Sequence, residues 1–262
     1  MLHAITPLIL TYNEAHNIQR TLSQLTWADR IVVVDSYSTD NTIDILHGKP
    51  HKRSHPHVEI FQREFDDHTS QWNYGLEQVQ TEWVLSLDAD YLITDSLIEE
   101  LKNLSVDSDI DGYFAAFKYC VFGKPLKGTI LPPRQVLFRT SKAIYINDGH
   151  TQLLKLSGKS DFLSQPIWHD DRKPFTRWLW AQDRYMIIES QKLTETKDER
   201  LSFGDRIRQQ KMLAPFIIFV YCLIVKQGIL DGWRGWYYAF QRMLAEIILS
   251  IRLIESEKKL EF

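Results

Sequence analysis

The sequence predicts an α/β protein, with a Rossmann-like mixed sheet, helices on both faces of that sheet and a C-terminal amphipathic helical region. Three observations support this. Short β-rich runs alternate with helical segments in the first part of the chain, the order that builds a parallel sheet. Residues 113–157 hold strand-like runs without helices between them, so we expect antiparallel strands there. After residue 171, apolar residues recur at helical spacing almost to the end.

Four buried strands are predicted in the N-terminal third, because each is a short apolar run bounded by polar residues. No Gly-x-Gly-x-x-Gly motif follows the first strand, so a dinucleotide-binding fingerprint is absent. The strands are expected at residues 4–10, 30–35, 58–62 and 82–88.

Helical segments are predicted between these strands. Apolar residues recur at helical spacing over residues 18–25, and residues 70–80 are expected to form another helix. Between them, Ser38 or Thr39 is expected to cap a short helix. The basic loop 47–57 is either a metal-binding segment or a solvated linker, and its irregular histidine spacing favours the linker.

We expect three parts in the chain. Residues 1–110 and residues 111–171 form the two halves of one α/β domain. Residues 172–262 form a helical tail.

The composition is that of an ordinary globular protein, with 44% hydrophobic residues, 25% charged residues and a formal net charge of −3. This charge gives no global case for nucleic-acid binding. Residues 172–262 hold 16 Lys and Arg against 11 Asp and Glu, whereas the remainder holds 15 against 23. A basic tail on an acidic body indicates different partners for the two parts.

The two cysteines, Cys120 and Cys222, each lie in an apolar run, so we expect core residues rather than a disulfide framework or a zinc site. The N-terminus "MLHAITPLIL" has neither a basic region nor a small-residue cleavage site. We therefore expect no secretory signal and a cytoplasmic location.

The stretch "WVLSLDAD" ends a buried run with two carboxylates, Asp88 and Asp90. Burying an unpaired carboxylate costs several kcal/mol, so a pair at a strand end requires a cation, strong donors or water. On an extended chain, residues i and i+2 point to the same side, so both carboxylates can face one divalent ion. The alternative is a solvated loop, because a lone D-x-D is a weak motif.

Two further polar clusters strengthen the case for a site. "TYNE" (residues 11–14) follows the first predicted strand and "DSYSTD" (residues 35–40) follows the second. In open α/β sheets, ligands bind beyond the carboxyl ends of the strands. Three clusters at one edge therefore favour a binding site.

These strands and clusters resemble the inverting glycosyltransferases of family two, which have the GT-A fold. The matching text is "LTYNEAHNIQRTLSQLTWADRIVVVDSYSTDNTIDIL" followed by "WVLSLDAD". The tail, with "WLWAQDRYMIIES" and "FVYCLIVKQGILDGWRGWYYAFQRMLAEIILSIRLIE", resembles that of bacterial enzymes that glycosylate lipopolysaccharide core or related cell-envelope glycans. The resemblance implies a hexosyltransferase that uses UDP-glucose or a similar UDP-sugar and a lipid-linked or envelope glycan acceptor. It also implies that residues 1–110 are the nucleotide-sugar-binding half of the domain and residues 111–171 its acceptor-side half.

The resemblance also implies roles for individual residues. Asp90 would ligate Mg²⁺ or Mn²⁺ bridging the diphosphate, and Asp88 would contact the ribose or the metal and its hydration shell. The metal would neutralise charge on the leaving UDP. Asp35 would hydrogen-bond the base or ribose. The loop implied to line the nucleotide pocket consists of Thr11, Tyr12, Asn13 and Glu14.

The sequence departs from the family pattern at two places. Tyr91 follows the D-x-D where many relatives have an acidic residue, and Thr151 follows His150 where many envelope transferases have His-Glu. Inversion needs a group that takes the proton of the acceptor hydroxyl. Asp148 is our first candidate for this base and His150 the second. The alternative for both is a turn built from Asn-Asp-Gly.

Three more side chains have two interpretations each. Arg134 and Arg139 flank "QVLF" and are either nucleotide-phosphate ligands or surface arginines on a strand. His169, in "WHDD", either helps to hold the metal or diphosphate, as a late histidine does in several GT-A enzymes, or belongs to a capped helix start.

The tail contains 13 uncharged, mostly apolar residues in a row, Leu213 to Val225. About 20 are needed for a helix to span a bilayer, so this run is too short. Basic residues flank it and aromatic residues follow, which favours a helix lying on an anionic membrane surface over a buried core helix. We therefore expect peripheral association with the inner face of the plasma membrane.

Two other functions stay open. A phosphatase can also use a strand-end D-x-D, but it would carry the motif on its first strand and have Thr or Val where this chain has Leu92. A catalytically inactive sugar-nucleotide-binding protein is the other alternative, because the His-Glu pair is missing.

Overall fold

The computed structural model describes residues 1–48, 57–105, 109–148, 151–196 and 201–259. The chain forms two compact units, a first unit of Met1–Gly123 with Leu131–Arg172 and a second unit of Lys124–Ile130 with Lys173–Phe262. The two halves expected at residues 1–110 and 111–171 lie almost entirely in the first unit, whose main sheet contains strands of both, and their separate roles stay predictions.

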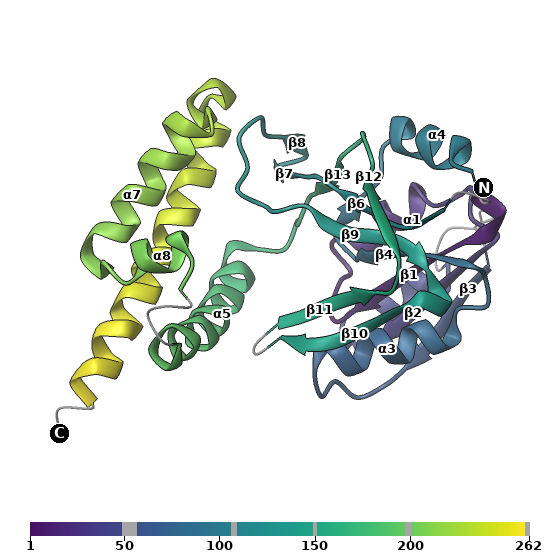
Figure 1. The fold of residues 1–262 in the computed structure, drawn as a ribbon, viewed down its shortest axis with the longest axis horizontal. Coiled ribbons are helices and arrows are strands. Elements are labelled where there is room, and N and C mark those ends of the chain that lie inside the picture. The colour runs from purple at the N-terminus through teal and green to yellow at the C-terminus, as the bar shows by residue number, and fades with distance from the viewer. Residues whose placement is uncertain (49–56, 106–108, 149–150, 197–200, 260–262) are drawn as a thin grey trace. The chain divides into compact units, whose positions relative to one another are not determined.

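The main sheet of the first unit has the strand order β12-β6-β9-β4-β1-β2-β3 (Figure 1). β1, β2, β3 and β4 are parallel, whereas β9 runs antiparallel to both β4 and β6. The predicted mixed α/β sheet is therefore confirmed. The strands are β1 (Ile5–Thr11), β2 (Arg30–Asp35), β3 (His57–Gln62), β4 (Trp83–Asp88), β6 (Ile110–Ala115), β9 (Arg134–Arg139) and β12 (Lys159–Phe162).

Both faces of this sheet are buried, as the unbroken apolar runs of the sequence require. In β2, Ile31 and Val33 face one core, and Val32 and Val34 face the other. Helices α1 (Ile18–Ser23) and α4 (Asp95–Asn103) contribute to the first core, and α3 (His68–Gln78) contributes to the second. Helices on both faces are therefore confirmed.

The helix starts follow local capping chemistry. The Asp67 side chain accepts a hydrogen bond from the Ser70 amide at the start of α3. Helix α2 (Thr42–Leu46) has Asn41 at its N-cap without a side-chain bond, so the expected cap by Ser38 or Thr39 is wrong. Ser38 hydrogen-bonds Asp35 instead. The histidine-rich loop lies largely outside the described residues.

A smaller group of strands completes the first unit. β13 (Ile167–His169) pairs with β5 (Tyr91–Leu92) on one side and with β7 (Phe117–Val121) on the other. A hairpin of β10 (Ala143–Asp148) and β11 (Thr151–Leu156) packs on α3, where Tyr145 stacks against Trp72 with ring centroids 5.4 Å apart.

The second unit is helical. Its small core joins α5 and α8 through Leu193, Leu249 and Leu253. Arg208 of α6 links the same two helices through ion pairs with Glu189 and Glu246. Among the described residues, no helix is long and apolar enough to cross a membrane. The elements are β8 (Lys124–Pro125), α5 (Phe175–Glu195), α6 (Phe203–Arg208), α7 (Ala214–Val220), the π-helical turn η5 (Tyr221–Val225), η6 (Gly228–Asp231) and α8 (Trp233–Lys259).

Residues 124–130 belong to this unit because their backbone is bound to it. The amides of Lys127 and Gly128 donate to the Asp231 carboxylate. A Cβ added at Gly128 would lie 1.8 Å from the carbonyl oxygen of Lys226, so the close approach of the two backbones requires glycine there.

Each unit carries one buried free thiol, Cys120 in the first and Cys222 in the second. Burial raises the pKa of Cys120 to about 12 and that of Cys222 to about 11. The thiolate is the reactive form, so in the native protein at pH 8 we expect both to react with an aromatic disulfide reagent at least about a hundredfold more slowly than a free cysteine.

The Cys120→Ser and Cys222→Ser variants serve as matched reporters in this experiment. Each leaves one thiol, so labelling during a denaturant titration follows the opening of one unit at a time. Prompt labelling of either thiol without denaturant would contradict the buried positions.

Candidate active site

The carboxyl ends of three central strands lie together at one edge of the main sheet. Thr11 at the end of β1 pairs with Asp35 at the end of β2, and Leu10 pairs with Asp88 at the end of β4. The polar clusters that follow these strands therefore share the edge at which α/β sheets bind ligands.

The loops after β1 and β2 are locked to each other by hydrogen bonds. Asp35 is fully buried, and its carboxylate accepts from the Thr11 hydroxyl and the Ser38 amide, each at 2.8 Å. Asn13 has a left-handed backbone, with φ of 56°, and its side chain accepts from the Thr39 amide at 2.8 Å. These hydrogen bonds hold the two loops together beside the strand ends.

The other two residues of the predicted pocket loop differ in exposure. The Glu14 amide donates to the Thr42 hydroxyl at 2.8 Å, and the Glu14 carboxylate accepts from Asn17 at 2.9 Å. Tyr12, in contrast, is 46% exposed.

Asp90 meets His169 beyond the end of β4. Nε2 of His169 lies 3.1 Å from Oδ2 of Asp90, and the Asp90 side chain is only 12% exposed. The backbone here is fixed on both sides, because Thr21 donates to the Ala89 carbonyl and the Asp170 amide donates to the Asp90 carbonyl. The carboxylate of Asp90 and the imidazole of His169 are thus held next to each other by a fixed backbone.

His169 lies on a strand, so the alternative interpretation of "WHDD" as a helix start is wrong. Residues 167–169 form β13, which pairs with β5 and β7. Helix α5 begins six residues after His169, at Phe175. The rings of Tyr91 and Tyr119 contact the imidazole edge-on, with centroids 5.4 Å and 5.3 Å from it. These contacts restrict the orientation of the imidazole.

The charge state of His169 depends on its carboxylate neighbours. Burial lowers its pKa, but the attraction of Asp90 and the hydrogen bond to it, with help from Asp88 and Asp171, outweigh burial and raise the pKa above the usual value. In the absence of a cation, these carboxylates therefore favour the protonated imidazole over the neutral one.

Asp88 forms the more open side of the site. Its side chain is 45% exposed, and Nη1 of Arg134 lies 3.9 Å from Oδ2. Arg134 also donates to the Tyr91 hydroxyl at 3.1 Å. Burial and the nearby Asp88 raise the pKa of Tyr91, so this phenol stays neutral where many relatives carry an acid.

The structure does not bring Arg139 to this edge. Arg139 pairs with Trp83, the first residue of β4, whereas Asp88 is the last. Its guanidinium forms ion pairs with Glu82 and Asp111. Of the two predicted phosphate ligands, Arg134 alone lies beside the D-x-D.

The candidate base is only partly described. β10 and β11 pair as far as Asp148 opposite Thr151. His150 and the side chain of Asp148 lie outside the described residues, so their roles stay predictions.

The donor set fits a divalent cation. The carboxylates of Asp90 and the nearby Asp88 are oxygen donors of the kind that suits Mg²⁺ or Mn²⁺, and the neutral imidazole of His169 would add a softer donor. The described residues hold no cluster of three or more His, Cys, Asp or Glu side chains arranged for a metal. A cation that is bound by only one or two protein ligands keeps coordination positions for phosphate oxygens and water, which is the usual arrangement for such ions at nucleotide sites.

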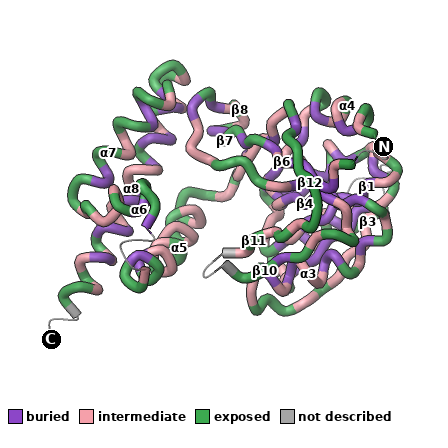
Figure 2. The backbone as a smooth tube through the Cα atoms, in the orientation of Figure 1, coloured by how far each residue is buried: buried purple, intermediate pink, exposed green. Residues whose placement is uncertain are grey.

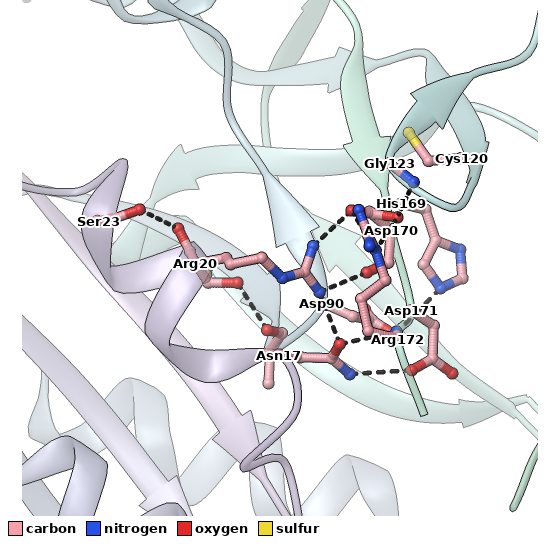
Figure 3. A network of polar contacts seen from close by, with 12 residues as sticks. Asn17, Arg20, Ser23, Asp90, Cys120, Gly123, His169, Asp170, Asp171 and Arg172 are labelled. Carbon is pink, nitrogen blue, oxygen red and sulfur yellow. Dashed lines mark hydrogen bonds and ion pairs between the residues drawn. The ribbon is translucent and has the colours of Figure 1, made fainter. Parts of the chain in front are cut away.

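Sequence reasoning missed a network centred on Asp170 (Figure 3). The Asp170 side chain is 3% exposed and accepts from Arg20, from Nε of Arg172 at 2.9 Å and from the Gly123 amide at 3.1 Å. Asn17 of the same region accepts from the Arg172 amide at 2.9 Å. The network binds the residues directly after His169 to α1, which fixes the position of the imidazole.

Similar proteins were found at the level of sequence. Over 90 residues the chain is 37% identical to the SPbeta prophage-derived glycosyltransferase SunS of Bacillus subtilis, a match that covers 34% of this chain and 20% of SunS. It is 28% identical over 112 residues to an uncharacterized glycosyltransferase of Rickettsia bellii, covering 42% of this chain and 36% of that protein. The matched region is thus a minor part of these relatives.

Similar folds were found among solved structures. The mannosyltransferase PcManGT from Pyrobaculum calidifontis, solved with GDP-Man and Mn²⁺, superposes with a TM-score of 0.57 at 12% identity, covering 96% of this chain and 87% of that chain. S. aureus TarS 1–349 in complex with UDP-GlcNAc gives a TM-score of 0.52 at 17% identity, covering 98% and 92%. These similarities confirm the GT-A fold.

The sequence model of glycosyl transferase family 2 matches residues 8–154, more than half of the chain. This match begins within β1 and ends within β11, and it therefore includes the ends of β2 and β4 with Asp35, Asp88 and Asp90. The resemblance inferred from the sequence is confirmed, and the chain belongs to glycosyl transferase family 2.

Proposed function

We propose that this protein is a metal-dependent, inverting hexosyltransferase that moves a sugar from a UDP-sugar, such as UDP-glucose, to a lipid-linked or cell-envelope glycan. The observation that carries the proposal is the Asp90–His169 pair beside Asp88, at the carboxyl edge of the sheet. Nucleotide-sugar complexes of proteins with the same fold support the donor class.

Different residues would bind the cation, the phosphates and the nucleoside. Asp90 and His169 would hold Mg²⁺ or Mn²⁺, and Asp88 would orient the hydration shell or the ribose. When bound, the cation neutralises charge on the departing diphosphate. Arg134, beside Asp88, offers a guanidinium to a phosphate oxygen. The interlocked loops after β1 and β2, with Asp35 at their centre, would hold the nucleoside.

A calorimetric and thermal-shift panel tests the donor. Nucleotide sugars are compared with and without Mn²⁺, because a ligand at 100 times its dissociation constant adds about 2.7 kcal/mol of stability. We expect a UDP-sugar with Mn²⁺ to give the largest shift. Binding without turnover on any envelope extract would favour the inactive alternative. The phosphatase alternative is disfavoured, because the D-x-D follows β4 rather than the first strand.

Asp148 is our proposed general base. The Asp148→Asn variant keeps the shape of the side chain but removes the proton acceptor, so kcat should fall by at least about 100-fold while nucleotide binding stays nearly intact. Steady-state kinetics and calorimetry on the same preparation separate the two effects.

His150→Ala is the matched comparison for this experiment. A fully active Asp148→Asn variant combined with an inactive His150→Ala variant would move the base to His150. Loss of nucleotide binding in Asp148→Asn would show that the residue acts on the donor instead.

A further inference from the structure

The second unit carries an apolar surface that its own fold leaves exposed. Figure 2 colours stretches of α7 and α8 as exposed. We define it by six side chains, each at least 41% exposed. Three recur at four-residue spacing along α7 and η5, and three lie on the first two turns of α8. They are Phe216, Val220, Ile224, Trp233, Trp236 and Phe240.

This apolar surface is additional to the face that packs inward. Ala214, Pro215, Cys222 and Leu223 are the buried residues of α7 and η5, and they fill the interior of the unit. A helix that is apolar all round is normally surrounded by protein or lipid. The segment of α7 and η5 is therefore not a fully buried core helix. It packs on the unit with one side and is exposed on the other.

The two helices that carry these side chains pack on each other through the half-buried ring of Phe219. The ring of Phe219, on α7, lies 5.9 Å from the Trp236 ring and 5.1 Å from the Phe240 ring, measured between centroids. Contiguous exposed apolar area of this kind marks an interaction site rather than scattered surface residues.

The charges beside this surface are positive. Between Arg206 and Arg242 the sequence has six Lys and Arg and one acid, Asp231. Two of these cations are paired with acids outside the segment, Arg208 with Glu189 and Glu246 and Lys211 with Glu257. Asp231 accepts hydrogen bonds from the backbone of residues 127 and 128. The second unit as a whole has 17 Lys and Arg against 11 Asp and Glu, a net charge of +6.

Two of these cations lie against aromatic rings, one that belongs to the surface and one on η5 beside it. Nζ of Lys226 lies 5.7 Å from the ring centroid of Tyr221, and the Arg234 guanidinium lies 4.6 Å from that of Trp233. Aromatic rings with adjacent Lys and Arg are the side chains enriched where a protein meets the headgroup layer of a membrane.

We propose that this apolar surface docks the second unit on an anionic lipid bilayer, with α7 and the start of α8 lying in the interface. Charge complementarity favours a bilayer over a second copy of the chain, because a self-complementary dimer would bring like charges together. The proposal does not depend on the sugar-transfer activity, since docking needs neither donor nor metal.

Vesicle co-sedimentation of the full chain tests this proposal. We expect binding to vesicles containing phosphatidylglycerol, weaker binding to phosphatidylcholine alone, and a blue shift of tryptophan fluorescence as Trp233 and Trp236 enter the interface. The variant F216S/V220S/I224S should lose at least about tenfold in partitioning, because three apolar side chains no longer enter the lipid. Lys226→Gln should lower binding to anionic vesicles by roughly fivefold.

The matched control places the same change on similarly exposed apolar residues outside the surface, in I144S/L153S/I251S. This control should bind vesicles like the unaltered chain. Full-length protein that never co-sediments with anionic vesicles would overturn the proposal, and so would equal loss in both triple variants. A dimer in solution that only F216S/V220S/I224S dissociates would also overturn it and assign the surface to self-association.

Discussion

Replacing Asp90 with asparagine is expected to abolish Mn²⁺-dependent binding of the nucleotide sugar and its transfer together. Asparagine keeps the size of the side chain but loses the charge that a divalent cation requires. Asp90 is the carboxylate that contacts the half-buried His169 beyond the end of β4, so the substitution removes the negative charge at that position. Outer-shell partners of metal ligands already contribute about 10–100-fold to affinity, so loss of a ligand should cost at least about 100-fold.

Calorimetry of a UDP-sugar with and without Mn²⁺ measures this effect. Asp161→Asn is a suitable control, because Asp161 is an exposed carboxylate on the edge strand β12, which β6 and β9 separate from β4. Asp88→Asn should be damaging but less severe, since Asp88 is the more exposed of the pair. Unchanged affinity and turnover in Asp90→Asn would show that the D-x-D is a solvated strand end.

The features that the sequence predicted well depend on local patterns. Unbroken apolar runs such as "RIVVVD" specify strands buried on both faces, and the structure divides β2 between two cores. Polar residues after such runs must lie at a strand end, and parallel pairing then brings the ends together. The D-x-D edge was therefore predictable from spacing alone.

The features that it missed depend on residues far apart in the chain. Arg20 and Asp170 are 150 positions apart, and no local pattern connects them. β13 has three residues, too few for a periodicity, and the carboxylates after it imitate a helix cap. Arg134 and Arg139 look equivalent in the sequence because they lie on one strand. The direction of that strand places Arg139 beside the first residue of β4 and Arg134 beside the last.

The Asp170→Ala substitution is expected to destabilise the first unit by about 3 kcal/mol. Removing one partner of a buried ion pair typically costs about 3–5 kcal/mol, because the other charge stays without compensation. Here the value should fall at the lower end, since the Arg20 and Arg172 side chains are 31% and 38% exposed and keep part of their hydration. Denaturant unfolding followed by Cys120 labelling, in a Cys222→Ser background, measures the free energy of unfolding for this unit alone.

Glu99→Ala is the matched control, because Glu99 and Lys102 form an ion pair of the same chemistry with side chains 61% and 60% exposed. Exposed pairs contribute about 0–1 kcal/mol, so this variant should unfold almost like the unaltered chain. A double-mutant cycle with Arg20→Ala should show coupling to Asp170, because the two residues share one network. Equal stability of the Asp170→Ala and Glu99→Ala variants would contradict a structural role for the network, and the support of His169 would then have to come from β5, β7 and the two tyrosine rings.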